Sequence, residues 1–472
     1  RAQIADEDRR LAALQEPEDF DRWGGYRKAG WREQPTGFYR AARRDGFWWL
    51  ITPEGNPCFY VGVDLCPATT WETTPITGRE ELYEWLPPRE QPWAAAWSRN
   101  QWGINDGTEY VCFYTCNLIR KYGAEKWADE ALARCIRRLK AFGFSGGGKW
   151  GAPREMPQAP VLWAWNTPKL AGHPDVFDAD VCAAFEKDLR RQIEPRLDDP
   201  SIVGWSFGNE ISEVIKRDEV RKILSMSADV PAKRALVDYA LREIYAGSIE
   251  NISKAWSVNA RSAAELYNAA PTVPDADVER LRLFYEDRYW SFVYETVKRI
   301  DPNHLFMSVW LVPGWWESED DWRVAARHCD VLGYDRYALE FADDRLRRLL
   351  READKPALCG EFSFPAWYDG WRGFGRYPVA AKDDAEAGDL YYRWVHDAAR
   401  NPYCVGVMWF QYRDQPITGR GPGKGLSAAI GEHYAFGIIT ETDQVKWDLA
   451  LRMRKANLQA AAWRLEAMAQ NR

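Results

Sequence analysis

Short apolar runs alternate with amphipathic segments along most of the chain. Runs of this length, rich in Val, Ile, Leu and aromatic residues, are typical of strands buried on both faces of a parallel sheet. Eight runs predict such strands: Cys58–Cys66, Phe144–Gly148, Pro160–Trp165, Ile202–Phe207, His304–Leu311, Asp330–Tyr337, Ala357–Phe362 and Val405–Phe410.

The segments between the runs repeat apolar positions every three or four residues, which is the period of an amphipathic helix. They predict helices over Lys126–Ala141, Ala179–Glu194, Pro231–Ala246, Asp277–Ile300, Arg345–Ala353, Ala385–Arg400 and Asp448–Gln470. Eight buried strands separated by helices are the pattern of a (β/α)8 TIM barrel. We therefore predict an α/β fold, a (β/α)8 barrel with long βα-loop insertions and an N-terminal hairpin.

The chain is longer than such a barrel requires. A TIM barrel takes about 250 residues, whereas this chain has 472. The surplus predicts insertions at about 67–125 and 245–274, which would wall the mouth of the barrel. Residues 1–45 are predicted to form an extension that packs on a catalytic barrel spanning 46–472. Phe47–Ile51, followed by turn-forming residues, predicts a hairpin that leads into the first strand.

Charge and composition exclude several classes of protein. With 63 Lys and Arg against 70 Asp and Glu, the net charge is -7, so we expect no nucleic-acid partner. No apolar run reaches the roughly 18 to 20 residues that a membrane span requires. Nine cysteines without a CxxC pair, and five histidines without a paired-ligand spacing, predict neither a metal site nor another cofactor.

Tryptophan is unusually abundant, with 26 residues beside 22 tyrosines and 19 phenylalanines. The flat face of an indole suits stacking, and its N–H needs a partner when the ring is buried. In an acidic chain with a large apolar fraction, this excess favours a carbohydrate ligand.

Two motifs suggest other chemistries. Gly143–Lys149 has the spacing of a phosphate-binding loop, but Trp150 stands where Ser or Thr would hold Mg²⁺, and a helix precedes the glycines. We interpret this segment as a helix end followed by the second strand.

Gly204–Gly208 fits the GxSxG motif of esterases, whose serine lies on a sharp strand-to-helix turn. Here Ser206 falls inside a strand that continues to Glu210. A serine esterase using Ser206 and a non-catalytic carbohydrate-binding barrel stay as alternative functions.

Two glutamates end predicted strands, Glu210 the fourth and Glu361 the seventh. The carboxyl ends of barrel strands carry the active site, so these two carboxylates are expected to meet across its mouth. Retaining cleavage of a glycosidic bond uses two carboxyl groups about 5 to 5.5 Å apart, one as proton donor and one as nucleophile. We therefore predict Glu210 and Glu361 as the catalytic pair of an O-glycosyl hydrolase.

The residues around this pair resemble a known family. Asn209 directly precedes Glu210, and the likeness includes Phe47–Gly55, Tyr245–Trp256, Asp301–Leu305 and Gly431–Tyr434. Its most specific part is Met408–Pro416, followed by Thr418–Arg420. From about Gly46 onwards, the chain resembles the clan A retaining glycoside hydrolases. Within that clan it is most similar to the β-agarases of glycoside hydrolase family 50, with some likeness to the family 42 β-galactosidases.

The resemblance implies that Glu210 is the acid/base and Glu361 the nucleophile of a double displacement through a covalent glycosyl-enzyme intermediate. It implies that Asn209 binds the sugar 2-OH, Tyr337 holds the nucleophile, and Trp409 lies under the sugar at the −1 position. The substrate would be a β-linked galactan poly- or oligosaccharide, with an exo-acting β-galactosidase on small oligosaccharides as an alternative. We expect such an enzyme to be secreted or periplasmic, and we assign no oligomeric state.

Several positions depart from the pattern of the family. Asp64 and Asp335 stand where Asn is common, and Lys149 precedes Trp150 in place of an Asn. Two roles fit Lys149: it binds a sulfate or carboxylate on the sugar, or it pairs with Asp64 or a neighbouring carboxylate. A sulfated or otherwise modified galactan therefore stays open. The predicted substrate-binding residues are Asn209, Tyr337, Trp409, Trp150, Lys149, Asp64, Asp335, Gln411, Glu432, Trp315 and Trp316.

Overall fold

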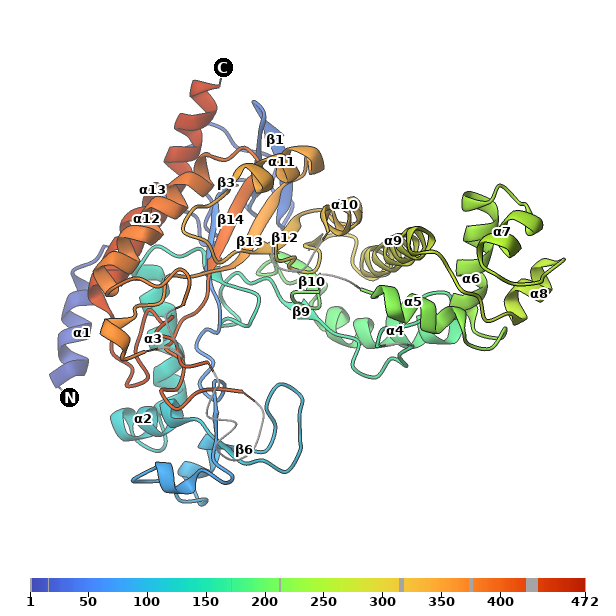
Figure 1. The fold of residues 1–472 in the computed structure, drawn as a ribbon. Coiled ribbons are helices and arrows are strands. Elements are labelled where there is room, and N and C mark those ends of the chain that lie inside the picture. Colours follow the sequence, from blue (N-terminus) through green and yellow to red (C-terminus); the bar gives the residue numbers. More distant parts are fainter. Residues whose placement is uncertain are drawn as a thin grey trace.

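The computed structural model of the protein describes residues 2–15, 17–170, 172–211, 214–313, 318–372, 377–421 and 432–471. The fold is a mixed α/β arrangement in which helices surround a group of parallel strands (Figure 1). Among the described residues, no helix is both long enough and apolar enough to cross a membrane.

The parallel strands form two sheets, and each strand overlaps one of the eight predicted runs. In the five-stranded sheet the order is β12 (Leu332–Asp335), β13 (Ala357–Phe362), β14 (Cys404–Trp409), β4 (Tyr60–Val63) and β8 (Gly146–Gly147). In the three-stranded sheet the order is β11 (Leu305–Phe306), β10 (Gly204–Phe207) and β9 (Val161–Leu162). The prediction of eight parallel strands is therefore confirmed.

Backbone contacts also run between the two sheets. Leu311, which follows β11, forms a parallel bridge with Tyr334 of β12. β8 forms the other edge of the five-stranded sheet, and there the N–H of Gly147 donates to the carbonyl of Pro157 at 2.9 Å. The N–H of Ala159 donates to the carbonyl of Gly148 at 3.2 Å. The residues before β9 are thus hydrogen-bonded to β8.

A bulky side chain, Trp310, packs against the strands of the five-stranded sheet. It belongs to a buried cluster that takes residues from both sheets, among them Tyr60, Val203, Met307, Leu358 and Met408. A Cβ on Gly333 would lie 2.8 Å from the Trp310 ring, and one on Gly360 only 2.3 Å from it. Glycine is therefore required at both positions for the indole to fit.

The predicted helices are also present, with shifts of a few residues at their ends. They are α3 (Trp127–Ala141), α4 (Ala179–Ile193), α6 (Pro231–Tyr239) with the π-helical turn η4 (Ala240–Ile244), α9 (Asp275–Ile300), α11 (Asp344–Ala353), α12 (Asp384–Arg400) and α13 (Trp447–Gln470). Helices α12 and α13 lie side by side, and η3 (Glu194–Arg196) extends α4. Helix α10 (Glu319–Arg327), which begins at a capping box on Ser318, was not predicted.

The first insertion forms a lobe of its own, seen at the bottom of Figure 1. Its elements are β5 (Thr74–Pro75), η1 (Glu80–Leu82), η2 (Trp93–Ala96), β6 (Trp97–Ser98), β7 (Tyr110–Val111) and α2 (Phe113–Tyr122). The three strands pair antiparallel around a small core that includes Ile76, Ala96, Val111 and Cys116.

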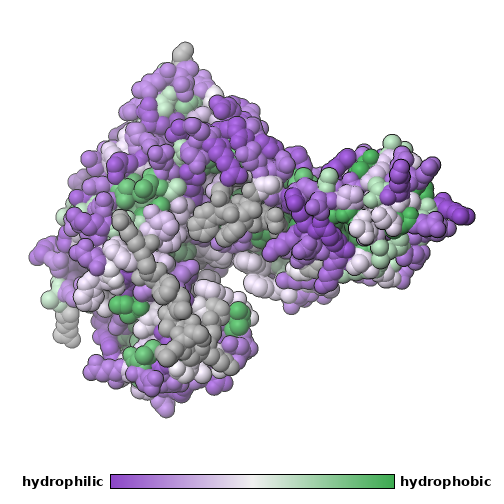
Figure 2. Space-filling view, in the orientation of Figure 1, coloured by the Kyte–Doolittle hydropathy of each residue, from purple (hydrophilic) through white to green (hydrophobic). Residues whose placement is uncertain are grey.

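The second insertion is a helical arm that projects from the rest of the molecule (Figure 1). The range predicted for it contains α7 (Ile249–Ala255) and α8 (Ala263–Asn268), but the arm already begins at α5 (Arg217–Leu224) and includes α6. Figure 2 shows a mostly hydrophilic surface with separate hydrophobic patches, hollowed between this arm and the lower lobe.

The N-terminal region consists of α1 (Ala2–Ala12) and an antiparallel sheet of β1 (Arg40–Arg44), β2 (Phe47–Ile51) and β3 (Pro57–Cys58). The predicted hairpin is confirmed, because Leu50 pairs with Cys58 in its ladder. The predicted boundary at residue 45 falls in the turn between β1 and β2, which pair along their whole length.

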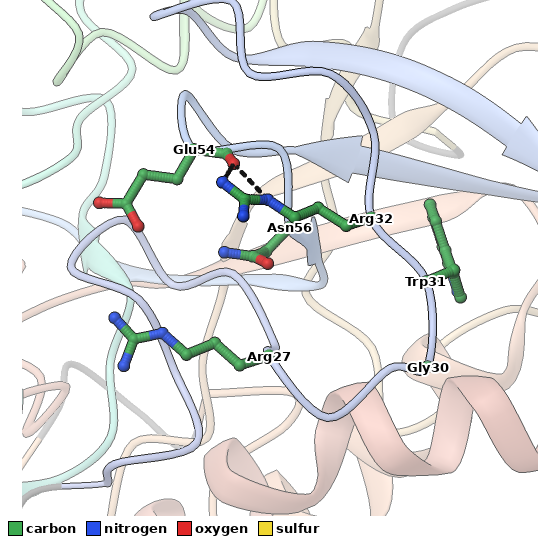
Figure 3. A pocket seen from close by; sticks show the side chains of 6 residues that line it. All are labelled: Arg27, Gly30, Trp31, Arg32, Glu54 and Asn56. Carbon is green, nitrogen blue, oxygen red and sulfur yellow. Dashed lines mark hydrogen bonds between the residues drawn. The ribbon is translucent and has the colours of Figure 1, made fainter.

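A cavity of about 440 Å³ beside this sheet is lined by Arg27, Gly30, Trp31, Arg32, Glu54 and Asn56 (Figure 3), none of them a predicted site residue.

A buried ionic network ties α1 to the rest of the protein. Arg138 of α3, with 1% of its side chain exposed, donates to Glu7 of α1 at 2.9 Å and to Asp443 at 2.6 Å. Lys121 of α2 also contacts Asp443, at 2.8 Å. Burial alone would raise the pKa of Asp443, but Arg138 and Lys121 outweigh it and hold this pKa well below its ordinary value.

Replacing Asp443 by Asn is expected to lower the free energy of unfolding at neutral pH by about 3 to 5 kcal/mol. The positive charge of Arg138 would stay buried without the negative charge of Asp443 beside it. The folded-state pKa is depressed, so this stabilisation is present above the unfolded value of about 3.9 and is lost as the pH falls through the folded value. Urea unfolding of both proteins should therefore show their largest difference at neutral pH and a smaller one in acid.

Asp389→Asn provides the control, because its partner Arg452 and Asp389 itself lie at the surface. Its effect should stay below about 1 kcal/mol. A difference between wild type and Asp443→Asn that is equally small, or that grows as the pH falls, would contradict the prediction.

Candidate active site

Acidic side chains gather where the parallel strands end. Asp64 directly follows β4, and Glu210 lies shortly after β10. Asp335 is the last residue of β12, and Glu361 is the last but one of β13. Carboxylate oxygens from Glu210, Asp335 and Glu361 all lie within 4.8 Å of one another. The structure thus brings together the two glutamates that the sequence pairs, with the predicted site residue Asp335 beside them.

Two hydrogen bonds and one ion pair hold Glu361. Its side chain is nearly buried, and the residue is 5% exposed. The Trp150 indole N–H donates to Oε1 at 2.7 Å, the Lys149 Nζ lies 2.9 Å from the same oxygen, and the Tyr337 hydroxyl donates to Oε2 at 2.6 Å. Oε1 therefore accepts one hydrogen bond and also pairs with the ammonium, whereas Oε2 accepts one hydrogen bond and keeps a further lone pair.

Glu210 lies in a turn just beyond β10. The strand ends at Phe207, and Glu210 adopts a left-handed φ of 51°, which is uncommon for a residue other than glycine. It is half-buried, as is Asn209 before it. Backbone conformations of this kind occur preferentially at functional sites, where the surrounding structure maintains them.

Lys149 lies among the carboxylates and has no exposed side-chain surface. Its Nζ contacts Asp335 Oδ2 at 2.5 Å and Asn209 Oδ1 at 2.5 Å, besides Glu361. Asp64 is bound differently, because its Oδ1 accepts from the backbone N–H of Lys149 at 2.7 Å and of Trp150 at 3.2 Å. Of the two roles open for Lys149, the structure therefore displays the pairing with neighbouring carboxylates.

The cluster shifts the ionisation of its members. Burial raises the pKa of Asp335 well above its ordinary value, with Glu361 and Glu210 adding to the effect, although the ion pair with Lys149 opposes it. Burial and Glu361 likewise raise the pKa of Asp64. For Lys149, burial disfavours the charge, but Asp335, Glu361 and Asp64 outweigh it and raise the pKa. The carboxyl groups of Asp335 and Asp64 thus bind protons more tightly than usual while Lys149 keeps its charge, as expected of ionisable groups that interact strongly.

Trp409 is placed away from this cluster. It is 1% exposed, its indole N–H donates to the carbonyl of Phe436 at 2.8 Å, and its ring contacts Phe362 and Tyr391 of α12. Since successive strand residues point to opposite sides, the next residue, Phe410, packs instead beside Tyr337, with ring centroids 6.5 Å apart. The Trp409 ring therefore faces the helices and is not available to a sugar at the cluster.

Two other predicted residues take part in hydrogen bonds next to the cluster. The amide of buried Gln411 donates to Glu72 at 3.1 Å. Glu432 pairs with Arg420 at 2.7 Å, and Arg420 also pairs with Glu72 at 2.5 Å. Glu72 was not predicted, because it lies in the first insertion, outside every predicted strand. Trp315 and Trp316 lie outside the described residues.

Ser206 does not form the arrangement of an esterase. It lies inside β10, fully buried, where its hydroxyl donates to the carbonyl of Pro160 at 3.2 Å and accepts from the Trp310 indole at 2.9 Å. Neither partner is a base, and no strand-to-helix turn exposes the hydroxyl. The phosphate-loop spacing is likewise explained by the fold, because α3 ends at Ala141 and Lys149 turns toward the carboxylates.

A row of tryptophans leads outwards from Glu361. Trp150 stacks on Trp163 with centroids 6.5 Å apart, and Trp163 stacks on Trp165 at 5.0 Å. Trp165 is 66% exposed, and Gly103 of the first insertion lies against its ring, next to Trp102, which is 57% exposed. The spacing of Trp163 and Trp165 by two positions, together with the tryptophan excess, was the signal for this row in the sequence.

The fold and the site together define a class: an α/β protein with paired carboxylates at the carboxyl ends of parallel strands. Comparisons with known proteins agree with this class. The chain is 28% identical to Beta-agarase B of Vibrio sp. (strain JT0107) over 91% of this chain and 49% of that protein, and 26% identical to Beta-agarase A of the same organism over 87% and 44%. It thus spans about half the length of the curated relatives it matches.

A solved structure of an agarase, AgWH50C, superposes with a TM-score of 0.84 and 25% identity, covering 98% of this chain and 70% of that one. No protein-family model matches the chain.

Proposed function

We propose that this chain is a retaining β-glycosidase of glycoside hydrolase family 50 that cleaves an agarose-type galactan. The observation that carries the proposal is the placement of Glu361, held by Tyr337, Trp150 and Lys149, with a carboxylate oxygen of Glu210 within 4.8 Å. So close an approach favours the spacing of about 5 to 5.5 Å in retaining enzymes over the roughly 6.5 to 9.5 Å of inverting enzymes. The likeness to beta-agarases supports the choice of substrate.

In the proposed reaction, Oε2 of Glu361 attacks the anomeric carbon while Glu210 gives its proton to the departing glycosidic oxygen. The C–O bond of the substrate breaks as the bond to Oε2 forms. Glu210, now ionised, takes a proton from water, whose oxygen displaces Glu361 and restores both carboxyl groups. In this scheme Glu210 carries the proton and Glu361 is ionised before the first step.

We also propose that the eight parallel strands close into a (β/α)8 barrel of the clan A type. The bridge from Leu311 to Tyr334 and the hydrogen bonds of Gly147 and Gly148 to residues 157 and 159 support closure at both pairs of edge strands. A closed barrel would place the carboxyl ends of β4, β8, β10, β12 and β13 around one mouth.

Within this proposal, a neutral galactan is favoured over a sulfated one. The ammonium of Lys149 is already engaged by Asp335, Glu361 and Asn209, so it offers no charge to an anionic sugar. The surrounding carboxyl groups would repel a sulfate. The tryptophan row and exposed Trp102 supply apolar faces on which sugar rings of a longer chain can stack. An enzyme acting on such a polymer would work outside the cytoplasm, in keeping with a secreted or periplasmic location.

The test is digestion of agarose, carrageenan and an aryl β-galactoside, followed by chromatography of the products. Agarose should release oligosaccharides faster than carrageenan by about tenfold or more, because a sulfate beside the carboxylates costs binding free energy. The Ser206→Ala variant should retain this activity. Release from the aryl galactoside alone would favour the exo-β-galactosidase, and sugar binding without cleavage would favour a non-catalytic barrel. Hydrolysis of an ester substrate by the wild type that is lost in Ser206→Ala would favour the esterase.

A further inference from the structure

The ammonium of Lys149 makes two hydrogen bonds and one further ion pair within the protein. A lysine ammonium carries three N–H groups and no acceptor. Its Nζ lies 2.5 Å from Asn209 Oδ1, 2.5 Å from Asp335 Oδ2 and 2.9 Å from Glu361 Oε1. The aromatic rings of Trp150 and Trp310 lie 5.5 and 4.9 Å away, and the side chain has no exposed surface.

This arrangement determines which end of Asn209 is free to act. Because Lys149 only donates, the atom of the amide that faces it must be the oxygen. The NH₂ group of Asn209 is then turned to the opposite side, where it is a donor to a sugar hydroxyl. A reversed amide would place two donors against each other, at the cost of leaving an N–H of the ammonium unpaired in a buried site.

The same ammonium determines which oxygen of Glu361 can attack. Oε1 accepts the hydrogen bond from Trp150 and pairs with the Lys149 ammonium, whereas Oε2 keeps a lone pair beside its hydrogen bond from Tyr337. Asp335 balances the charge of the ammonium and anchors it from β12, so that Nζ stays between Asn209 and Glu361. Lys149 reaches this position from the end of β8.

We propose that Lys149, anchored by Asp335, is a positioning residue that orients the Asn209 amide and directs Oε2 of Glu361 to the substrate. This inference rests on the proposed glycosidase function. It assigns Lys149 no contact with the sugar, in contrast to the sulfate-binding role considered from the sequence. The groups that face Glu361 from the surrounding elements are Asp64, Lys149, Glu210, Asp335, Tyr337 and Tyr377.

The experiment compares Lys149→Met, Asp335→Asn and the double variant with the wild type. Lys149→Met should lower kcat on agarose by about 10- to 100-fold, the loss typical of removing a residue that orients the groups in contact with the substrate, with little change in KM. It should also move the acidic limb of the kcat/KM profile to higher pH, because the carboxylates lose their cation and take up protons more readily. Lys149→Arg, which keeps the charge, should restore part of kcat.

The double variant separates positioning from stability. When both Lys149 and Asp335 lose their charge, neither is left buried without its partner, so the urea midpoint should be higher than in Lys149→Met. Neither kcat nor the acidic limb of the pH profile should recover. Lys233→Met is the matched control, because Lys233 is also buried and donates to the carbonyls of Met226 and Ala269 in the helical arm. It should lower the midpoint without moving the pH profile.

Two results would overturn the proposal: a Lys149→Met variant with wild-type kcat and pH profile, or a double variant whose kcat recovers together with its stability. If the wild type cleaves none of the three substrates, the proposed function fails. The contact between Lys149 and Glu361 can then still be tested by the urea unfolding midpoints of Lys149→Met, Glu361→Gln and their combination. Non-additive shifts support the placement of the ammonium against Glu361, and additive shifts contradict it.

Discussion

Replacing Glu361 by Gln is expected to lower kcat on agarose by about 10⁴-fold or more, since an amide cannot form the covalent bond of the first step. Gln has nearly the same shape, and its Oε1 can still accept from Trp150 and Lys149. Binding of an agarose oligosaccharide should therefore persist in the variant. Initial rates measure the first effect, and isothermal titration with the oligosaccharide measures the second.

Glu286→Gln is a matched control for the loss of a buried carboxylate. Glu286 is fully buried in α9 and pairs with Arg282 at 2.9 Å, far along the chain from the carboxylate cluster. That substitution should affect stability and leave kcat within a small factor of wild type. A Glu361→Gln enzyme that keeps substantial activity would remove Glu361 from the role of nucleophile.

Replacing Glu210 by Gln is expected to have the second largest effect, a loss of about 10² to 10⁴ in kcat on agarose. The departing sugar alkoxide is a poor leaving group and needs a proton, which Gln cannot give. An aryl galactoside with an acidic phenol needs no such help, so its first step should survive and its second, base-assisted step should become slow. Stopped-flow measurement should then show a burst of phenol followed by a slow phase.

The burst distinguishes the two glutamates. Glu361→Gln should show none with the same aryl galactoside, because the bond to the enzyme never forms. Equal losses on agarose and on the aryl galactoside in Glu210→Gln, without a burst, would contradict an acid/base role for Glu210 and point to a purely structural one.

Much of the scaffold was predictable from the sequence because buried parallel strands and amphipathic helices leave strong local patterns. β13 coincides with its predicted run, and α3, α11 and α12 begin within one residue of theirs. The helical arm was only partly predicted, since α5, α7 and α8 are short and the pattern between Glu210 and α9 is not that of a barrel. Short helices depend on tertiary packing more than on local propensity.

The site was predictable as a pair of glutamates at strand ends, but not as a network. The family resemblance implied that the ring of Trp409 lies under the sugar. In the structure, the alternation of strand residues turns Trp409 toward α12 and brings Phe410 beside Tyr337. The position of Lys149 depends on contacts with residues 60, 186 and 212 positions further along the chain (209 − 149, 335 − 149 and 361 − 149). No local pattern reports contacts across such distances, so the sequence left two roles open for it.

The central claim is that Glu210 and Glu361 act by double displacement, and the anomeric configuration of the first product tests it most directly. Proton NMR of an agarose oligosaccharide digest, recorded before mutarotation, should show the new reducing end as the β-anomer, because two inversions at the same carbon retain its configuration. Initial formation of the α-anomer would contradict this account, since it would require a single displacement by water.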